Sequence, residues 1–315
     1  MHQPSLCATL GVNEIACEVA GEVFDLFCGA GGFSEGAEEA GARVVFACDA
    51  DELAIEYHSK QHPDCIHWCC ALPRDDLPFP TDGRRFHVHA SPPCQRFSSA
   101  GRKDGEHGEA ERLIRWAVRV CQVATTWSLE QVPAPSVLRI LEQLRLQFRG
   151  NLAYHVFNFE DLGVPQRRKR VIAGSPSLIQ RLQRRASCSR RLSIADAIDV
   201  GEFTHLRREQ HFVSFRKATS RERRERGSVN VYKKPTAGDH LHRVDGLAPT
   251  VIAVKQLGHL SRLRDGRWDQ RPLRVHELAA LQTFEPRTWP ARKSDAMRLI
   301  GNAVPPRVAE LLLRP

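Results

Sequence analysis

The chain has 315 residues, of which 42% are hydrophobic and 26% are charged. Its length favours two domains, or one α/β domain with a large insertion. No apolar run reaches the length of about 18 residues that a membrane span needs, and residues 1–20 lack the pattern of a secretory signal. We therefore expect a protein that is not secreted and contacts no membrane. It would act inside the cell, in the cytoplasm of a prokaryote or virus-infected cell, or in a nucleus.

Charge divides the sequence into two unlike halves. Residues 1–165 hold 14 basic and 23 acidic side chains, a net charge of −9, whereas residues 166–315 hold 32 and 14, a net charge of +18. Most of the basic residues in the second half are arginine, whose planar guanidinium suits phosphates and base edges. This half indicates a polyanionic partner such as nucleic acid, with a merely solvated basic surface as the alternative.

Strands and helices alternate through the first half of the chain. The hydrophobic pattern predicts helices from Gly32 to Gly41 and over 52–60, 110–125 and 135–148, and strands over 22–28, 43–48, 86–90, 127–132, 152–157 and 170–173. Such alternation is typical of an α/β fold with a doubly wound, mostly parallel sheet, whose ligands bind at the carboxyl ends of the strands.

From about residue 175 the alternation ends and arginine-dense stretches begin. We expect a 22–174 domain, a smaller domain of irregular or β structure over 175–268, and a 269–315 segment whose helices, over 272–284 and 294–313, return to the first domain. Residues 1–21 would be an extension. Within the smaller domain only 229–232 and 250–254 read as strands. The arginines of 181–191 and 207–226 are candidate phosphate contacts.

A glycine-rich turn follows the first predicted strand. Gly29, Gly31 and Gly32 lie between that strand and the next helix, so the backbone can approach a nucleoside closely. Asp49 ends the second strand, where its carboxylate could accept hydrogen bonds from ribose hydroxyls. Together they suggest a cofactor that contains adenosine, with an ordinary tight turn as the alternative.

Cys94 follows a strand and a rigid Pro-Pro turn at the same sheet edge. A lone cysteine is usually an inert filler. Here Glu130 ends the next strand, and Arg168 and Arg170 begin another. An acid and two guanidiniums around a thiol could grip and protonate a planar ring while sulfur attacks it.

Several motifs occur in the order and spacing of the DNA cytosine-5 methyltransferase family, which the chain resembles from about residue 22 to 310. They are DLFCGAGGFS at 25–34, SPPCQRFS at 91–98, QRRKR at 166–170, RPL at 271–273 with Glu277, LQTF at 281–284 and GNAVPP at 301–306. The resemblance implies a class I methyltransferase fold, a catalytic and cofactor-binding 22–174 domain, and a target-recognition domain over 175–268.

The resemblance implies transfer of a methyl group from S-adenosyl-L-methionine to C5 of a cytosine flipped out of double-stranded DNA. Cys94 would add to C6, Glu130 would hydrogen-bond the ring, Arg170 would hold O2, and Arg168 would organise the pocket. No metal is expected, and the enzyme would be a monomer. The implied cofactor site comprises Asp25, Phe27, Gly29, Gly31, Gly32, Asp49, Pro93, Asn302 and Val304. The implied DNA contacts are Gln95, Ser98, Gln166, Arg207, Arg208, Arg223, Arg224 and Thr250.

Three positions depart from the family pattern. Gln131 follows Glu130 where asparagine is usual, Ala50 replaces a frequent aromatic residue, and Cys70 lies where an adenine-contacting aspartate is usual. Two other functions remain open, a tRNA cytosine-5 methyltransferase and a catalytically silent relative that binds nucleic acid. The former branch usually carries a Cys-Phe-Thr stretch, which this sequence lacks. The latter is disfavoured because the cysteine, the acid and both arginines are present.

Overall fold

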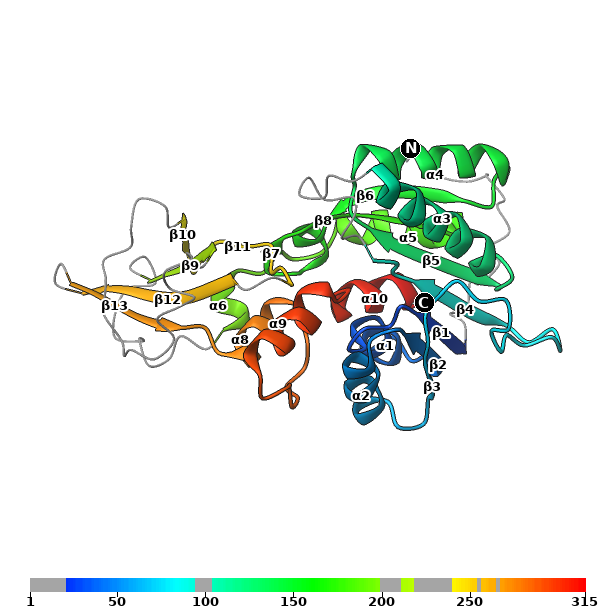
Figure 1. Ribbon diagram of the computed structural model, residues 1–315. Coiled ribbons are helices and arrows are strands. Elements are labelled where there is room, and N and C mark those ends of the chain that lie inside the picture. Colours follow the sequence, from blue (N-terminus) through cyan, green and yellow to red (C-terminus); the bar gives the residue numbers. More distant parts are fainter. Residues whose placement is uncertain (1–20, 94–103, 199–210, 218–239, 254–255, 265–266) are drawn as a thin grey trace, which may run out of the picture.

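The computed structural model describes residues 21–93, 104–198, 211–217, 240–253, 256–264 and 267–315. Its larger unit is built on a seven-stranded sheet in the order β3-β2-β1-β4-β5-β8-β6 (Figure 1). The strands are β1 (Glu22–Leu26), β2 (Arg43–Asp49), β3 (Ile66–Cys69), β4 (Phe86–Ala90), β5 (Thr126–Gln131), β6 (Ala153–Asn158) and β8 (Lys169–Gly174). The expected doubly wound α/β architecture is confirmed.

One strand runs against the others. The pairs β1–β2, β1–β4, β2–β3 and β4–β5 are parallel, whereas β8 is antiparallel to both of its neighbours, β5 and β6. The first residues of β8 therefore lie at the sheet edge where the parallel strands end. This reversal brings an arginine at the start of β8 to the carboxyl end of β5.

Helices cover both faces of the sheet with separate apolar cores. On one face pack α1 (Gly32–Glu39), α5 (Pro176–Ala186), α10 (Pro306–Leu313) and the short η1 (Phe159–Leu162). On the other face pack α3 (Asp104–Cys121) and α4 (Pro135–Gln147), while α2 (Glu52–Gln61) lies against β2 and β3. The α4 sequence explains its packing, because Val137, Ile140, Leu141 and Leu144 recur at helical spacing and are all buried.

Two histidines of β4 lie inside the sheet. His87 Nδ1 is 3.0 Å from Thr126 Oγ1 and its Nε2 is 3.0 Å from Ser128 Oγ. The His89 ring stacks on Phe33, with 3.5 Å between the ring centroids. Burial lowers the pKa of His87 to about 3 and that of His89 well below its usual value. Both rings are therefore neutral in the folded protein near pH 7.

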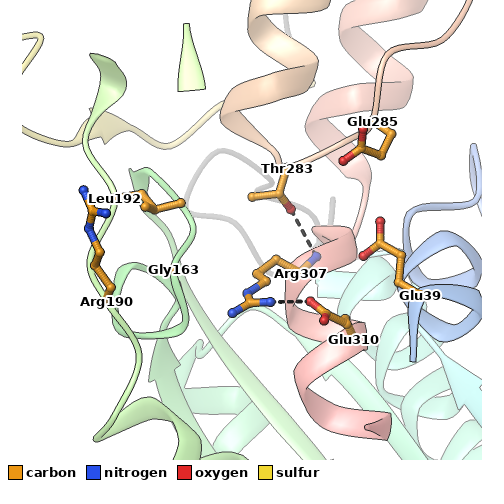
Figure 2. Close-up of a pocket in the computed structure, with 8 residues that line it drawn as sticks. All are labelled: Glu39, Gly163, Arg190, Leu192, Thr283, Glu285, Arg307 and Glu310. Atoms are coloured by element: carbon orange, nitrogen blue, oxygen red, sulfur yellow. Dashed lines mark hydrogen bonds and ion pairs between the residues drawn. The ribbon is translucent and has the colours of Figure 1, made fainter. Parts of the chain in front are cut away.

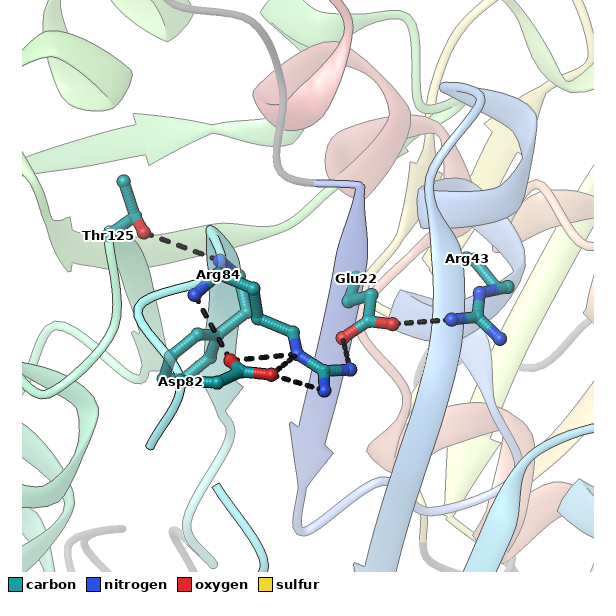
Figure 3. Close-up of polar contacts among 6 residues, drawn as sticks. Glu22, Arg43, Asp82, Arg84 and Thr125 are labelled. Carbon is teal, nitrogen blue, oxygen red and sulfur yellow. Dashed lines mark hydrogen bonds and ion pairs between the residues drawn. The ribbon is translucent and has the colours of Figure 1, made fainter. Parts of the chain in front are cut away.

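Ion pairs fasten the sheet at its opposite edge, where the parallel strands begin (Figure 3). The Glu22 carboxylate on β1 pairs with Arg43 on β2 and, at 3.5 Å, with Arg84. Arg84 also pairs with Asp82 at 2.6 Å just before β4. Because the arginines and Asp82 are largely solvent-exposed, each pair adds little stability, and none lies near the predicted site.

The smaller unit contains a four-stranded antiparallel sheet in the order β10-β9-β12-β13. Its strands are β9 (His211–Lys217), β10 (His240–Arg243), β12 (Gln256–Arg264) and β13 (Arg267–Pro272). A two-stranded parallel pair joins β7 (Gln166–Arg167) to β11 (Ala248–Pro249). The expected strand over 250–254 was wrong, because residues 250–253 follow β11 in irregular conformation. The expected strand over 229–232 lies outside the described residues.

The C-terminal helices divide between the two units (Figure 1). α6 (Ile194–Ala197), α8 (Val275–Leu281) and α9 (Lys293–Asn302) share one core cluster with Val244 and Leu260 of the smaller unit. α10 packs against α1 in the larger unit. α9 also contacts that unit, because Leu299 packs with Ala30 and Ala54. The 269–315 segment therefore contacts the larger unit through both α9 and α10.

The arginines of 181–191 differ in their surroundings. Arg181 and Arg185 on α5 both donate 2.8 Å hydrogen bonds to the carbonyl oxygen of Arg314, so they fasten α5 to the end of α10. Arg184 is exposed, and so are Arg190 and Arg191, which pair with Asp196 and Asp161. Contact of these three exposed arginines with DNA phosphates stays a prediction.

Candidate active site

A glycine turn connects β1 to α1. Phe27, Gly29 and Gly31 all have positive φ angles, of 60°, 55° and 84°. Glycine permits this conformation without strain at two of these positions. No atom lies within 4 Å of the place where a side chain on Gly29 would begin, whereas a Cβ on Gly32 would lie 2.2 Å from the Val304 carbonyl oxygen. The turn is thus open on one side and packed tightly on the other.

Asp49 lies beside the turn and binds its backbone. One carboxylate oxygen accepts a 2.9 Å hydrogen bond from the Gly29 N–H, and the other accepts one of 2.9 Å from the Asp51 N–H. Burial raises the pKa of Asp49. Cys70 lies beside it, because its N–H donates to the Asp49 carbonyl oxygen at 2.9 Å. The glycine turn, Asp49 at the end of β2 and Cys70 just after β3 therefore lie side by side. This arrangement fits a nucleoside that contains ribose.

Asp25 and Val304 lie behind the turn. Asp25 is fully buried, and its Oδ2 accepts a 2.7 Å hydrogen bond from Ser34 Oγ on α1. Burial raises the pKa of this carboxyl to about 7. The Val304 side chain is 5% exposed and belongs to the apolar core under α1. Both side chains lie in the protein interior next to the turn, whereas Asn302 is exposed. Contact of these three residues with the cofactor stays a prediction.

The turn that precedes Cys94 is tied to its neighbours. Ser91 Oγ donates a 3.0 Å hydrogen bond to the Phe27 carbonyl oxygen. Gln131 Nε2 donates one of 2.9 Å to the Pro92 carbonyl oxygen, while its Oε1 accepts from the Val132 N–H at 2.8 Å. The longer amide at position 131 therefore holds the Pro-Pro turn. Pro93 is exposed, and Cys94, Gln95 and Ser98 lie outside the described residues.

Glu130 and Arg170 form an ion pair at the same edge. Arg170 Nε lies 2.9 Å from Glu130 Oε1, and the two side chains are only 15% and 11% exposed. Glu130 is the last residue but one of β5 and Arg170 is the second residue of the antiparallel β8, so the reversal of that strand creates the pair. An acid held by a guanidinium, close to a sheltered edge, can recognise a planar ring with adjacent donors and acceptors.

Gln166 and Arg168 turn away from that edge into the protein. Gln166 is 0% exposed and Arg168 2% exposed. Gln166 donates to the carbonyl oxygen of Leu281, and Arg168 donates to those of Val251, Gly301 and Ala303. Both side chains are therefore engaged inside the protein, and the DNA contact expected of Gln166 and the pocket-organising role expected of Arg168 stay predictions.

The remaining predicted DNA contacts are only partly described. Thr250 is partly exposed, and its hydroxyl donates to the Arg167 carbonyl oxygen. Arg207, Arg208, Arg223 and Arg224 lie outside the described residues. In the part of the chain that the structure describes, no helix is both long and apolar enough to cross a membrane.

A cavity of about 410 Å³ opens where the two units meet, away from the residues discussed above. Figure 2 shows Arg307 between Thr283 and Glu310, with Glu39 and Glu285 nearby. The lining residues are Glu39, Gly163, Arg190, Leu192, Thr283, Glu285, Arg307 and Glu310. Of these residues Arg190 belongs to a stretch that was predicted to contact DNA phosphates, and the mixed charges of the lining define no one ligand.

The fold and this sheet edge define a doubly wound α/β protein with a glycine turn and an acid–guanidinium pair at the ends of its parallel strands. The family model for the C-5 cytosine-specific DNA methylase matches residues 21–127 and 137–314. The chain belongs to this family, whose members methylate cytosine in DNA.

Relatives and solved structures agree with this assignment. The chain is 27% identical over 311 residues to the type II methyltransferase M.HgiDI of Herpetosiphon aurantiacus, covering 92% of each chain. It is 26% identical over 310 residues to M.HindV of Haemophilus influenzae, covering 91% of this chain and 93% of that one. Its fold resembles the S. pombe Dnmt2 methyltransferase, with a TM-score of 0.60, 16% identity and coverage of 93% and 97%. The Entamoeba histolytica methyltransferase EhMeth gives a TM-score of 0.61 at 12% identity, with coverage of 93% and 96%.

The sequence did not single out Ser91 as a support of the edge. Ser91 was quoted only within a motif, although a hydroxyl at the end of a strand commonly binds nearby backbone. For Gln131 the longer amide suggested a different hold on the Cys94 segment, and the structure shows this amide bound to the Pro92 carbonyl oxygen.

Proposed function

We propose that this DNA methylase transfers the methyl group of S-adenosyl-L-methionine to C5 of a cytosine flipped out of double-stranded DNA, with Cys94 as the nucleophile. The Glu130–Arg170 pair carries the proposal. It places an acid and a guanidinium 2.9 Å apart at the edge that also holds the glycine turn and the turn leading to Cys94. A flipped base is required because C6 is inaccessible to a nucleophile while the base is stacked.

The cofactor assignment rests on the geometry of the turn. Asp49 is already placed against Gly29 and is only partly exposed, so its carboxylate can accept hydrogen bonds from ribose hydroxyls. Open space next to Gly29 leaves room for a ligand. Gly29, Gly31, Gly32, Phe27 and Asp49 would hold the nucleoside. When bound, S-adenosyl-L-methionine supplies an electrophilic methyl group.

Cys94, Glu130 and Arg170 would each have a separate role in the reaction. The Cys94 thiolate forms a bond to C6, and the electrons of the C5–C6 double bond move into the ring. Glu130 hydrogen-bonds the ring at N3 and the exocyclic amine, and Arg170 holds O2, so the negative charge that develops is stabilised. C5 thereby becomes the nucleophile and takes the methyl group of bound S-adenosyl-L-methionine, with S-adenosyl-L-homocysteine as the leaving group. A base then removes the C5 proton, and the bond between sulfur and C6 breaks to regenerate the thiolate.

DNA would be bound mainly by the basic half of the chain. Arg207, Arg208, Arg223 and Arg224 remain proposed phosphate contacts, and Thr250, Gln95 and Ser98 proposed contacts near the flipped base. We propose that the enzyme acts as a monomer inside the cell.

Bisulfite sequencing tests the proposal directly. Plasmid DNA from cells that express the wild-type protein should show protected cytosines within one recurring sequence, and DNA from cells that express Cys94→Ser should show none. Unprotected DNA with the wild-type protein would contradict the proposed function. Protection that survives in Cys94→Ser would contradict the proposed nucleophile.

A further inference from the structure

Three polar side chains are buried where the smaller unit meets the larger one. Gln166, Arg168 and Gln282, which we call the junction, are 0%, 2% and 0% exposed. Gln166 begins β7, Arg168 directly follows β7, and Gln282 directly follows α8. Figure 1 shows β7, β11, α8 and α9 where the two units meet. Burying three such groups is costly unless each finds hydrogen-bond partners.

The two glutamines join three backbone segments. Gln166 Oε1 accepts a 2.9 Å hydrogen bond from the Val251 N–H, and its Nε2 donates to the Leu281 carbonyl oxygen at 2.7 Å. The same Nε2 is 2.7 Å from Gln282 Oε1. Gln282 Nε2 in turn donates to the Ile300 carbonyl oxygen at 2.8 Å. The end of α8, the end of α9 and the segment after β11 are thereby fixed to β7.

Arg168 fastens the same segments at a second point. Its Nη1 donates to the Val251 carbonyl oxygen at 3.1 Å. Its Nη2 lies 3.2 Å from the carbonyl oxygen of Gly301 and 3.1 Å from that of Ala303. Val251 is therefore held through both its N–H and its carbonyl. Residues 248–253 connect β10 to β12, so the junction fixes the base of the smaller unit's sheet.

The junction also reaches both halves of the proposed active site. Ala303, which accepts from Arg168, precedes Val304, whose carbonyl oxygen packs against Gly32 in the glycine turn. Arg170, two residues after Arg168, holds Glu130 at 2.9 Å. A displacement of the smaller unit would therefore move the glycine turn and the acid–guanidinium pair together.

We propose that Arg168, with Gln166 and Gln282, is a positioning residue that couples the seating of the smaller unit on DNA to the alignment of Glu130 and Arg170. This inference rests on the proposed function. A rigid guanidinium can bind three carbonyl oxygens in fixed directions, whereas a lysine ammonium on a flexible stem cannot reproduce that geometry. Small misplacements of reacting groups cost about 100-fold in rate, so the coupling would make methyl transfer depend on correct DNA.

The test compares Arg168→Lys with Arg181→Lys. Arg181 is also buried and also donates to a backbone carbonyl oxygen, but on α5 at the end of α10. Three quantities are measured for each variant: thermal stability, cofactor affinity by calorimetry, and the single-turnover methylation rate at saturating DNA and cofactor. The rate is measured on the target sequence found by bisulfite sequencing and on duplexes with one base pair changed in it.

Both variants should lose stability. Arg168→Lys should in addition lower the saturated rate by about 10- to 100-fold and reduce the ratio of rates on target and altered DNA, with cofactor affinity changed less than about threefold. Arg181→Lys should keep the rate and the ratio. If both variants keep them, the junction is only structural and the inference is wrong. If Arg168→Lys does not fold, Gln282→Leu carries the same expectations and the same contradiction. A wild-type protein that methylates no DNA would instead contradict the proposed function.

Discussion

Replacing Gln131 by leucine should loosen the turn that leads to Cys94 and leave the groups proposed to bind the cytosine ring unchanged. Gln131→Leu keeps most of the side-chain volume but removes a donor from the Pro92 carbonyl oxygen and an acceptor from the Val132 N–H. A buried backbone group that loses its partner costs about 1–3 kcal/mol. The Val132 N–H is only partly buried, so we expect a total loss of about 2–4 kcal/mol in the free energy of unfolding.

The kinetic effect should exceed what stability alone explains. Pro92 lies two residues before Cys94, so a loosened turn misplaces the proposed nucleophile, and the single-turnover rate should fall about 10- to 100-fold. Transfer of a labelled methyl group to DNA at saturating substrates measures the rate, and urea unfolding measures stability. Gln143→Leu on the exposed part of α4 is the matched control and should change neither strongly.

Two results would refute this reasoning. If Gln131→Leu unfolds at the wild-type urea concentration, the amide is not held as the structure shows. If it loses stability but methylates at the wild-type rate, the turn does not position the nucleophile. Gln131→Asn is a useful intermediate, because the shorter amide cannot span the same gap of 2.9 Å to Pro92 without a shift of the turn.

Four further predictions concern the ring, the cofactor, the sheet interior and DNA. Glu130→Gln should lower the saturated methylation rate about 100- to 10,000-fold and leave cofactor affinity unchanged in calorimetry; a wild-type rate would exclude Glu130 from the chemistry. Asp49→Ala should weaken cofactor binding about 10- to 100-fold by calorimetry, and an unchanged affinity would place the nucleoside elsewhere. His87 is neutral when folded, with a pKa of about 3, and gains a proton on unfolding below pH about 6.5. Its contribution to stability is therefore present above that pH and is lost as pH falls towards 3, by about 1.4 kcal/mol per pH unit. Asp25, whose pKa is raised to about 7, changes the free energy of unfolding with pH in the opposite direction. Urea unfolding between pH 7 and 5 should therefore compare the wild type with His87→Asn. Equal pH dependence of the free energy of unfolding in the two proteins would contradict the neutral state of folded His87. DNA affinity should fall at least about 100-fold between 50 and 200 mM salt if about five phosphates are bound, and a flat response in a filter-binding assay would refute the basic clamp.

Much of the larger unit could be predicted because its signals are local. The buried strand, glycine turn and helix from Glu22 to Glu39 follow one another directly, and Asp49 ends the next strand as expected. The meeting of Glu130 and Arg170 was harder to foresee, since the hydrophobic pattern of β8 does not reveal its direction. Only the antiparallel pairing of β8 with β5 explains why the first residues of one strand face the last residues of the other.

The smaller unit was predicted less well for a different reason. β12 and β13 carry arginine, histidine and glutamine among few apolar residues, so their period-two signal is weak. Gln166 and Arg168 lie in a run of basic residues that reads as surface, yet both are buried by contacts with residues about 80 to 135 positions away. The residues next to these positions in the sequence do not reveal contacts with such distant partners.

A covalent complex gives the most direct test of the proposed reaction. Duplex DNA with 5-fluorocytosine at the target position cannot lose a proton from C5, so the enzyme should remain bonded to C6 after methyl transfer. Mass spectrometry of the digested complex should locate the modified nucleotide on Cys94, and Cys94→Ser should give no complex. A complex at another residue, or one that persists in Cys94→Ser, would contradict the account.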